Sequence, residues 1–215
     1  MIETLLTLLI IAVPVILAIT VHEAAHGYVA RHYGDLTAWQ LGRITLNPLR
    51  HIDPIGTVLV PALLYWSTGG AFLFGWAKPV PVNFGRLHNP KRDMLWVAAA
   101  GPFVNLLMAL GWALILKLAL AAADTGLGEL LAAMAKGGIT VNAVLMLLNL
   151  LPIPPLDGGR IAVSLLPHRL AWKFAQLERF GFIILLVLLF THVLDKILDP
   201  LLGGFLRLIQ AIFNI

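Results

Sequence analysis

The sequence predicts an all-α protein that crosses a membrane several times. Of its 215 residues, 60% are hydrophobic and only 12% are charged, and its mean hydropathy is +0.90. A soluble domain keeps roughly a quarter of its residues charged, because its surface faces water. The apolar residues are also grouped into long uninterrupted stretches that approach the length needed to span a bilayer, about 20 residues. We therefore expect about four transmembrane helices, together with a re-entrant or interfacial hairpin and a small membrane-associated β element.

The expected membrane spans are defined by the longest apolar stretches. They cover residues 5–30, 94–123, 130–151 and 180–194. Pro14 predicts a kink in the first span, and Pro152 marks the end of the third. The first stretch lacks a basic flank and a small-residue cleavage site, so we expect a retained helix and not a signal peptide. The tail, residues 201–215, is expected to form a short interfacial or packed helix.

Residues 54–77 are also uncharged but are not expected to form a single span. Pro61 lies within this stretch, and Ser67-Thr68-Gly69-Gly70 interrupts it. Each half is then too short to cross a bilayer, which predicts a re-entrant or interfacial hairpin.

Two segments beside this hairpin predict the β element. Residues 37–46 have the composition of a strand. Pro79-Val80-Pro81-Val82-Asn83 is expected to be extended, because proline fixes φ and prevents a helix. Prolines at this spacing favour an edge strand or a polyproline segment.

The absence of cysteine and the basic charge narrow the classes of function. Without cysteine there are no disulfides, no thiolate catalysis and no cysteine metal sites. The formal net charge is +4. No basic run is interleaved with aromatic residues, so we expect basic loops at anionic lipid headgroups and no nucleic-acid partner.

The first expected span contains the motif His22-Glu23-Ala24-Ala25-His26. Residues i and i+4 lie on the same face of a helix, so both imidazoles can reach one metal ion. Glu23 lies beside them, where a carboxylate can take a proton from an attacking water. Ionisable residues at membrane depth are costly and indicate function, so we predict a metal site here.

A third ligand is expected in the segment that follows the third span. This segment, residues 149–160, contains Asn149, a proline-rich stretch and then Asp157-Gly158-Gly159. The paired glycines allow a tight turn that can aim the Asp157 carboxylate, although an Asp here could also simply cap the next helix. The other candidate ligands are His32, His51, Asp53 and Glu129.

A further motif, Gly101-Pro102-Phe103-Val104-Asn105, lies in the second expected span. The chain thus has three motifs: His22 to His26, Gly101 to Asn105, and Asn149 to Gly159. In type and in order they resemble the HExxH, GPxxN and NxxPxxxLDGG motifs of the site-2 protease family (peptidase family M50). The resemblance implies that His22, His26 and Asp157 bind Zn²⁺ and that Glu23 is the general base. It further implies that Asn105 and Asn149 hydrogen-bond the substrate carbonyl or the oxyanion. Hydrogen bonding between helices is the alternative role for these two amides.

The resemblance also implies a function. We expect an intramembrane zinc metalloendopeptidase of the short form, without a PDZ domain, that cuts membrane proteins within or near their transmembrane segments in regulated intramembrane proteolysis. Its partners would be such substrates and the lipid bilayer. Residues 1–215 would form one domain, with a catalytic core at about 5–160 and C-terminal helices at 165–215. A membrane metal transporter or a non-proteolytic metal-binding membrane protein is the alternative, but the ionisable residues gather in one place and no inverted repeat is present.

The motifs also predict the topology. One metal can be reached from residues 22–26 and from residue 157 only if the first and third spans end at the same membrane face. The second span supplies the return crossing, so residues 54–77 cannot be a full crossing. Most loop Lys and Arg residues lie at the metal end. The positive-inside rule then predicts a multi-pass protein of the cell membrane with its active site open toward the cytoplasm.

Overall fold

The computed structural model describes residues 2–67, 69, 75, 77–122 and 125–215. Its α-helices are α1 (Ile2–His32), α2 (Thr37–Gln40), α3 (Val60–Ser67), α4 (Pro90–Ala121), α5 (Gly126–Leu150), α6 (Asp157–Leu165), α7 (His168–Ala175), α8 (Gly181–Phe190) and α9 (Val193–Phe213). Shorter helical turns cover Pro48–Arg50, Pro54–Leu59, Phe84–Arg86 and Gln176–Phe180.

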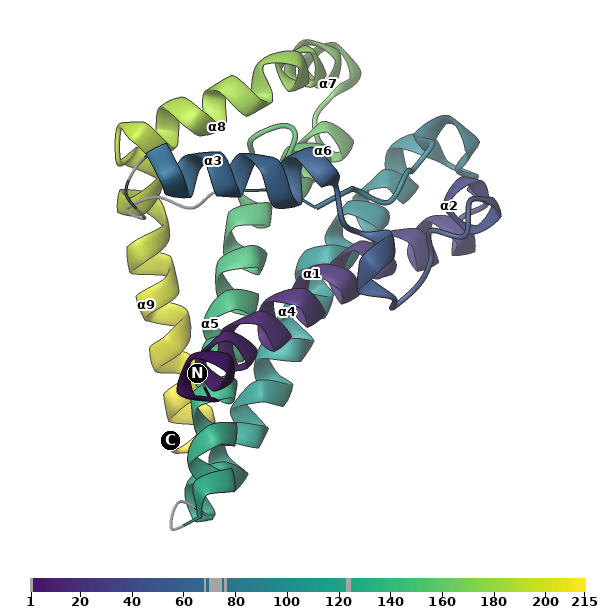
Figure 1. Cartoon of the computed structure of the whole chain (residues 1–215). Coiled ribbons are helices and arrows are strands. Elements are labelled where there is room, and N and C mark those ends of the chain that lie inside the picture. The colour runs from purple at the N-terminus through teal and green to yellow at the C-terminus, as the bar shows by residue number, and fades with distance from the viewer. Residues whose placement is uncertain (1, 68, 70–74, 76, 123–124) are drawn as a thin grey trace.

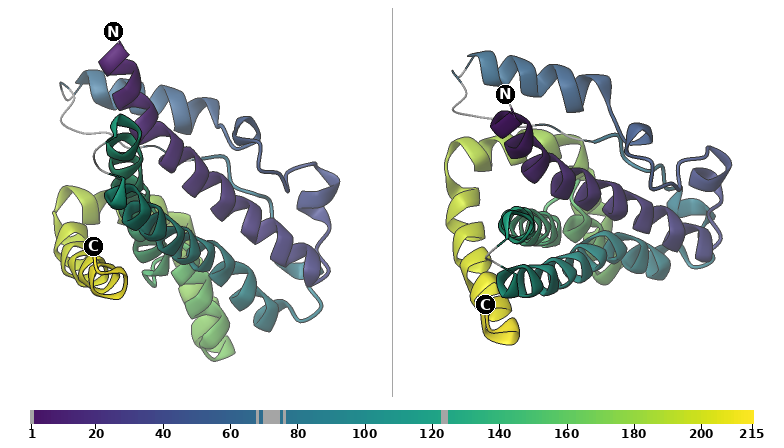
Figure 2. Two further views of the ribbon diagram at one scale, coloured as in Figure 1. Left: turned by 90° about the horizontal axis from the view of Figure 1, so that it is seen from below. Right: turned by 60° about the horizontal axis from the view of Figure 1, so that its bottom comes forward.

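Within the part of the chain that the structure describes, three helices are long and apolar enough to cross a membrane, and they confirm the first three predicted spans. They are α4, α5 and the Ile10–His32 part of α1. The helix α4 runs beside α5 in the opposite direction, and α1 lies obliquely against both (Figures 1 and 2). Pro14 and Pro102 lie inside α1 and α4 without ending either helix.

The C-terminal region differs from the prediction. The predicted fourth span, residues 180–194, is broken: α8 ends at Phe190, and the chain bends by 77° before α9 begins at Val193. His192 occupies this break with a left-handed φ of 56°, so the helix cannot continue through it. The predicted short tail helix is the second half of the 21-residue α9. Among the described residues there are therefore three candidate spans, or four if the bent pair is one span.

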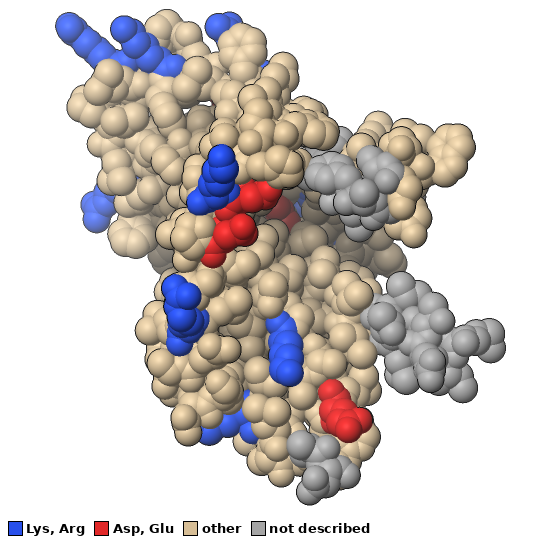
Figure 3. Space-filling view, turned by 90° about the vertical axis from the view of Figure 1, so that its left-hand side faces the viewer, with Lys and Arg blue, Asp and Glu red and all other residues tan. Residues whose placement is uncertain are grey.

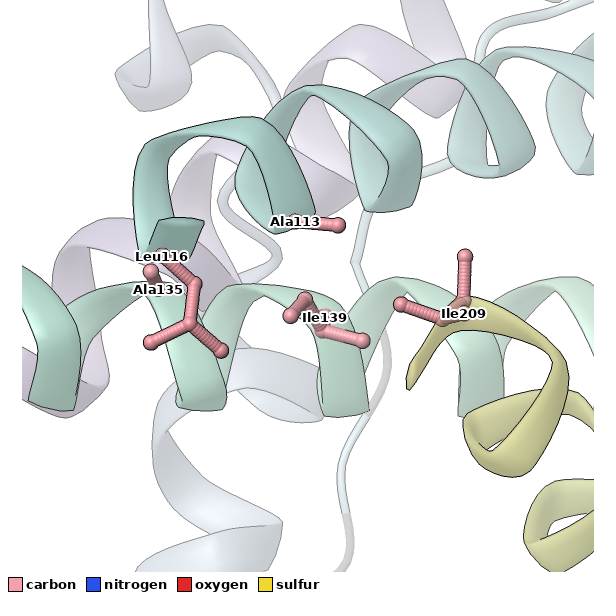
Figure 4. Packing of buried hydrophobic residues seen from close by; sticks show 5 residues of the cluster. All are labelled: Ala113, Leu116, Ala135, Ile139 and Ile209. Atoms are coloured by element: carbon pink, nitrogen blue, oxygen red, sulfur yellow. The ribbon is translucent and has the colours of Figure 1, made fainter. Parts of the chain in front are cut away.

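The core of the bundle joins α4, α5 and α9 through small and branched apolar residues. Ala113 and Leu116 of α4 face Ala135 and Ile139 of α5, and Ile209 of α9 completes the buried cluster (Figure 4). Small residues let helix backbones approach closely, which favours association in lipid.

Residues 54–67 form an apolar helical stretch that is too short to span a membrane. Asp53 begins it by accepting hydrogen bonds from the backbone N–H groups of Ile55 and Gly56. The helix α3 lies across the direction of α5 in Figure 1. Two of the four residues of the predicted turn, 68 and 70, and most of the second arm lie outside the described residues, so the hairpin stays a prediction.

The β element is not supported, because the described residues contain no strand. Thr37–Gln40 is helix α2, and Asp35 accepts hydrogen bonds from the backbone N–H and hydroxyl of Thr37. Such local side-chain bonds offer the backbone an alternative to strand pairing. Residues 79–83 lie outside any helix, as predicted, but they pair with no strand.

The surface of the molecule suits lipid contact. On the side where α9 lies in Figure 1, most of the surface is uncharged (Figure 3). Lys and Arg side chains lie at its upper end and at separate points down to the lower end, and acidic side chains lie at mid-height and near the lower end. Apolar side chains that would be costly in water, such as Phe182 and Ile183 of α8, are about half exposed. The chain is a multi-pass membrane protein.

Candidate metal centre

Three buried side chains converge between α1 and the start of α6. His22 Nε2 lies 3.1 Å from His26 Nε2, and these nitrogens lie 3.2 and 3.3 Å from Asp157 Oδ2. The histidines are one helical turn apart on α1, as the motif predicts. The structure thus brings together the three residues that the sequence singled out as ligands.

The other ring nitrogens are each held by a fixed acceptor. His26 Nδ1 lies 2.7 Å from the backbone carbonyl oxygen of Val97 in α4, and His22 Nδ1 lies 2.5 Å from Asn105 Oδ1. Because these oxygens only accept, each Nδ1 carries the proton. With the proton on Nδ1, the two Nε2 atoms face each other and a carboxylate oxygen. A positive charge at this point, from a metal ion or a proton, stabilises the arrangement.

Asn105 belongs to a buried chain of hydrogen bonds that links three helices. Its Nδ2 donates to Asn142 Oδ1 of α5 at 2.8 Å and to the Ala18 carbonyl of α1 at 3.3 Å. Asn142 in turn donates to the carbonyl of Gly138 at 2.8 Å. Both amides are fully buried. These contacts favour the helix-to-helix alternative for Asn105, which orients His22 in doing so.

Asp157 is the first residue of α6, and two glycines bring it to the histidines. The turn that leads from α5 is so close that a Cβ at Gly158 would collide with the carbonyls of Leu150 and Leu151. A Cβ at Gly159 would lie 2.5 Å from Pro154 N. Neither glycine has a positive φ, so both are needed because the turn is too tight to leave room for a Cβ.

The Asp157 carboxylate is buried, and its Oδ2 makes no hydrogen bond. Burial opposes ionisation, but positive charge on the His26 and His22 imidazoles outweighs it and lowers the pKa of the Asp157 carboxyl below its ordinary value. An unpaired buried carboxylate oxygen is costly. Its position against two imidazole nitrogens is explained if all three bind one ion.

Glycine at residue 101 makes room for the centre on the α4 side. A Cβ there would lie 2.5 Å from the Nε2 atoms of both His22 and His26. The GPxxN motif therefore contributes a position without a side chain, directly against the ligand atoms.

Glu23 lies beside the three ligands and is held by a backbone group. Its Oε2 accepts a hydrogen bond of 2.7 Å from the N–H of Val80. Glu23, the ligands, Val80 and Asn149 line one cavity of about 150 Å³. The cavity can hold a few water molecules beside the carboxylate. Asn149 donates to the Leu145 carbonyl of its own helix at 2.9 Å, so its predicted contact with a substrate stays a prediction.

The competing ligand candidates lie elsewhere. His51 is buried and bonds the Thr45 carbonyl, Asp53 begins the helical stretch after it, His32 packs on Tyr33, and Glu129 lies in the first turn of α5, at the end remote from Asp157. None of them belongs to the His22, His26 and Asp157 group.

Sequence reasoning missed Asn142, Val80 and the steric role of Gly101. Asn142 is the one of these with a usable signal, because an amide inside an apolar span needs a partner. Val80 acts through its backbone, which leaves no mark in the sequence.

Comparison with known proteins identifies the family. A relative from Bacillus subtilis (strain 168), named Putative zinc metalloprotease YwhC, is 40% identical over 215 residues, which cover 95% of this chain and 92% of the relative. The model of Peptidase family M50 matches residues 111–191. The chain belongs to this family. The chain is therefore a metalloprotease of the site-2 protease type, as the three motifs predicted.

More distant M50 relatives agree. Proteins named Putative zinc metalloprotease Rip2 are 31% identical in Mycolicibacterium smegmatis, over 84% of this chain and 66% of the relative, and 29% identical in Mycobacterium tuberculosis, over 93% and 71%. No solved structure matches the chain.

The centre fits zinc, the cofactor of M50 peptidases. Zinc in proteins is tetrahedral with bonds to nitrogen or oxygen of about 2.0–2.2 Å, which places neighbouring ligand atoms about 3.3–3.5 Å apart. The three atoms of this centre are 3.1–3.3 Å apart. Two imidazoles and one carboxylate are also a ligand set that catalytic zinc uses, leaving a fourth position open.

A methyl group at residue 101 should disturb the centre. In Gly101→Ala the new Cβ would contact both Nε2 atoms, so we expect zinc affinity to fall by about 10–100-fold, as when ligand orientation is lost. Competition with a fluorescent chelator measures it. The matched control is Gly111→Ala in the same helix, where a Cβ meets nothing within 4 Å. Equal affinities of the two variants would refute the proposed closeness of α4.

Proposed function

We propose that this M50 peptidase hydrolyses peptide bonds within or near the transmembrane segments of membrane-protein substrates, in regulated intramembrane proteolysis. In this proposal, His22, His26 and Asp157 hold zinc and Glu23 is the general base. The supporting observation is the location of the centre. His22 lies in the middle of the Ile10–His32 span, so a substrate peptide bond that binds beside it would lie at membrane depth.

The chemistry divides between the ion and Glu23. When bound, zinc polarises a carbonyl oxygen and makes water a stronger acid. Glu23 accepts the proton of the attacking water and then gives it to the nitrogen of the leaving amine as the C–N bond breaks. A carboxylate has two oxygens, so Glu23 can take the proton on one while Val80 N–H stays on the other.

The substrate must be unwound before it can react. A helical carbonyl is occupied by its i to i+4 hydrogen bond and surrounded by side chains, whereas an extended backbone exposes it. A protease segment with an exposed backbone edge could hold such an extended substrate by strand addition, and the two segments of the predicted β element are the candidates. Residues 37–46 are not a strand, which leaves residues 79–83, the extended segment that lines the cavity.

We also propose that residues 1–215 act as one protease domain.

The membrane orientation is part of the proposal. The end of α1, the start of α4 and the helices α6 and α7 lie at the same end of the molecule (Figure 1). Basic residues gather there, including Arg31, Lys91, Arg169 and Lys173. The positive-inside rule places this end, and the opening of the site, toward the cytoplasm of the cell.

Glu23→Gln should separate zinc binding from catalysis. Glutamine keeps an oxygen that can accept the Val80 N–H but cannot act as a base. We expect unchanged zinc content and loss of cleavage by a factor of about 10² or more, measured with a transmembrane model substrate in detergent, with chelator-treated wild type as a second control. Cleavage near the wild-type rate would disprove the proposed mechanism.

Cysteine labelling should reveal the topology, because the natural chain has no cysteine. We expect Arg50→Cys and Arg86→Cys to react with an impermeant reagent only from the cytoplasmic side. Gly126→Cys, where a Cβ meets nothing within 4 Å, should react only from the opposite side. Labelling of the first two from opposite sides would make residues 54–77 a full crossing and contradict the account.

A further inference from the structure

Residues 79–83 run along one face of α1, beside the catalytic centre. Val80 N–H bonds Glu23 Oε2 at 2.7 Å. The Val80 side chain lies against Gly27, where an added Cβ would be 3.1 Å from Val80 Cγ1. Farther along, Asn83 N–H bonds Asp35 Oδ2 at 2.6 Å, just beyond the end of α1. The segment is thus fastened at both ends to residues of the α1 region.

Asp35 is a fully buried carboxylate in which both oxygens are used. Oδ1 accepts from the backbone N–H of Thr37 at 3.0 Å and from its hydroxyl at 2.5 Å, and Oδ2 accepts from Asn83. Its own N–H bonds the Ala30 carbonyl at 2.9 Å. Asp35 is therefore fixed to the last turn of α1, and its hydrogen bond holds Asn83 at a fixed place relative to that turn.

The segment between the two bonds is stiff. Pro79 and Pro81 fix φ and flank Val80. Arg43 adds a third attachment by donating to the carbonyls of Lys78 and Pro79 at 3.0 and 3.3 Å. With so little freedom in the chain, the place of the Val80 N–H depends on where Asn83 is held.

We propose that Asp35 is a positioning residue for catalysis: by holding Asn83 it keeps the Val80 N–H on Glu23, and so orients the base. The inference rests on the proposed role of Glu23. Asp35 does not touch the three ligands, so it acts on the orientation of the carboxylate and not on metal binding. Asp35→Asn replaces one accepting oxygen with an NH₂ group, which cannot accept. The remaining oxygen faces two donors of Thr37 and one of Asn83, so the bond to Asn83 is the one expected to be lost.

The test compares Asp35→Asn with Thr37→Val, which removes the hydroxyl bond to Asp35 but leaves the bond to Asn83. For Asp35→Asn we expect full zinc content, KM within about twofold and a loss in kcat of about 10–100-fold, the scale of a misplaced catalytic group. Hydrogen exchange at the Val80 amide should quicken at least about tenfold, since this amide is held by the bond in question. For Thr37→Val we expect all four quantities close to wild type.

A second pair of variants covers a failure of Asp35→Asn to fold. Asn83→Pro removes the N–H donor and keeps Asp35, whereas Asn83→Asp keeps the donor. Asn83→Pro should show the same loss of kcat and the same faster exchange at Val80, and Asn83→Asp should show neither.

The outcomes separate this inference from the proposed function. Unchanged exchange at Val80 in both Asp35→Asn and Asn83→Pro, or unchanged kcat in both while Glu23→Gln is inactive, would overturn the positioning role. Cleavage by Glu23→Gln near the wild-type rate would instead overturn the proposed function, and the positioning role with it.

Discussion

The arrangement of the molecule depends on two imidazole nitrogens that face each other inside an apolar bundle. The Val97 carbonyl and Asn105 hold the protons of the two histidines on Nδ1, so both Nε2 lone pairs point to one place, where a carboxylate oxygen also lies. Without a cation these groups would repel one another at low dielectric. Four helices maintain this arrangement. The ligands come from α1 and α6, the acceptors of the two Nδ1 protons come from α4, and Asn142 of α5 accepts a hydrogen bond from Asn105.

Closeness is achieved mainly by residues that lack a side chain. Gly101 lets α4 approach the ligand atoms, Gly158 and Gly159 let the start of α6 pack onto the end of α5, and Gly27 admits the side chains of Val80 and Ile44. In lipid, helix association relies on such packing and on buried hydrogen bonds, because apolar side chains gain little by leaving a similarly apolar solvent. The same glycines and amides therefore serve stability and the site together.

Much of this could be predicted from the sequence, since the motif spacing determines a helical face and long apolar stretches determine spans. His22, His26 and Asp157 meet as expected, and three of the spans are where predicted. The break at His192 was missed because no proline or glycine marks it. The β element was wrongly expected at residues 37–46. There Asp35 accepts hydrogen bonds from the backbone N–H and the hydroxyl of Thr37, and these local bonds compete with strand pairing. Contacts of Val80 and Asn142 depend on helices meeting in three dimensions, which spacing along one chain does not describe.

The most direct test of the central claim is the zinc content of purified Asp157→Ala, measured beside His51→Ala and His32→Ala. His51 is a sharp control because it is also a buried histidine, with its Nδ1 unpaired, yet it lies outside the group of three. The account predicts that only the Asp157 variant loses zinc, because two imidazoles alone bind it far more weakly than the full set. Full zinc occupancy in Asp157→Ala, or loss of zinc in His51→Ala, would contradict it.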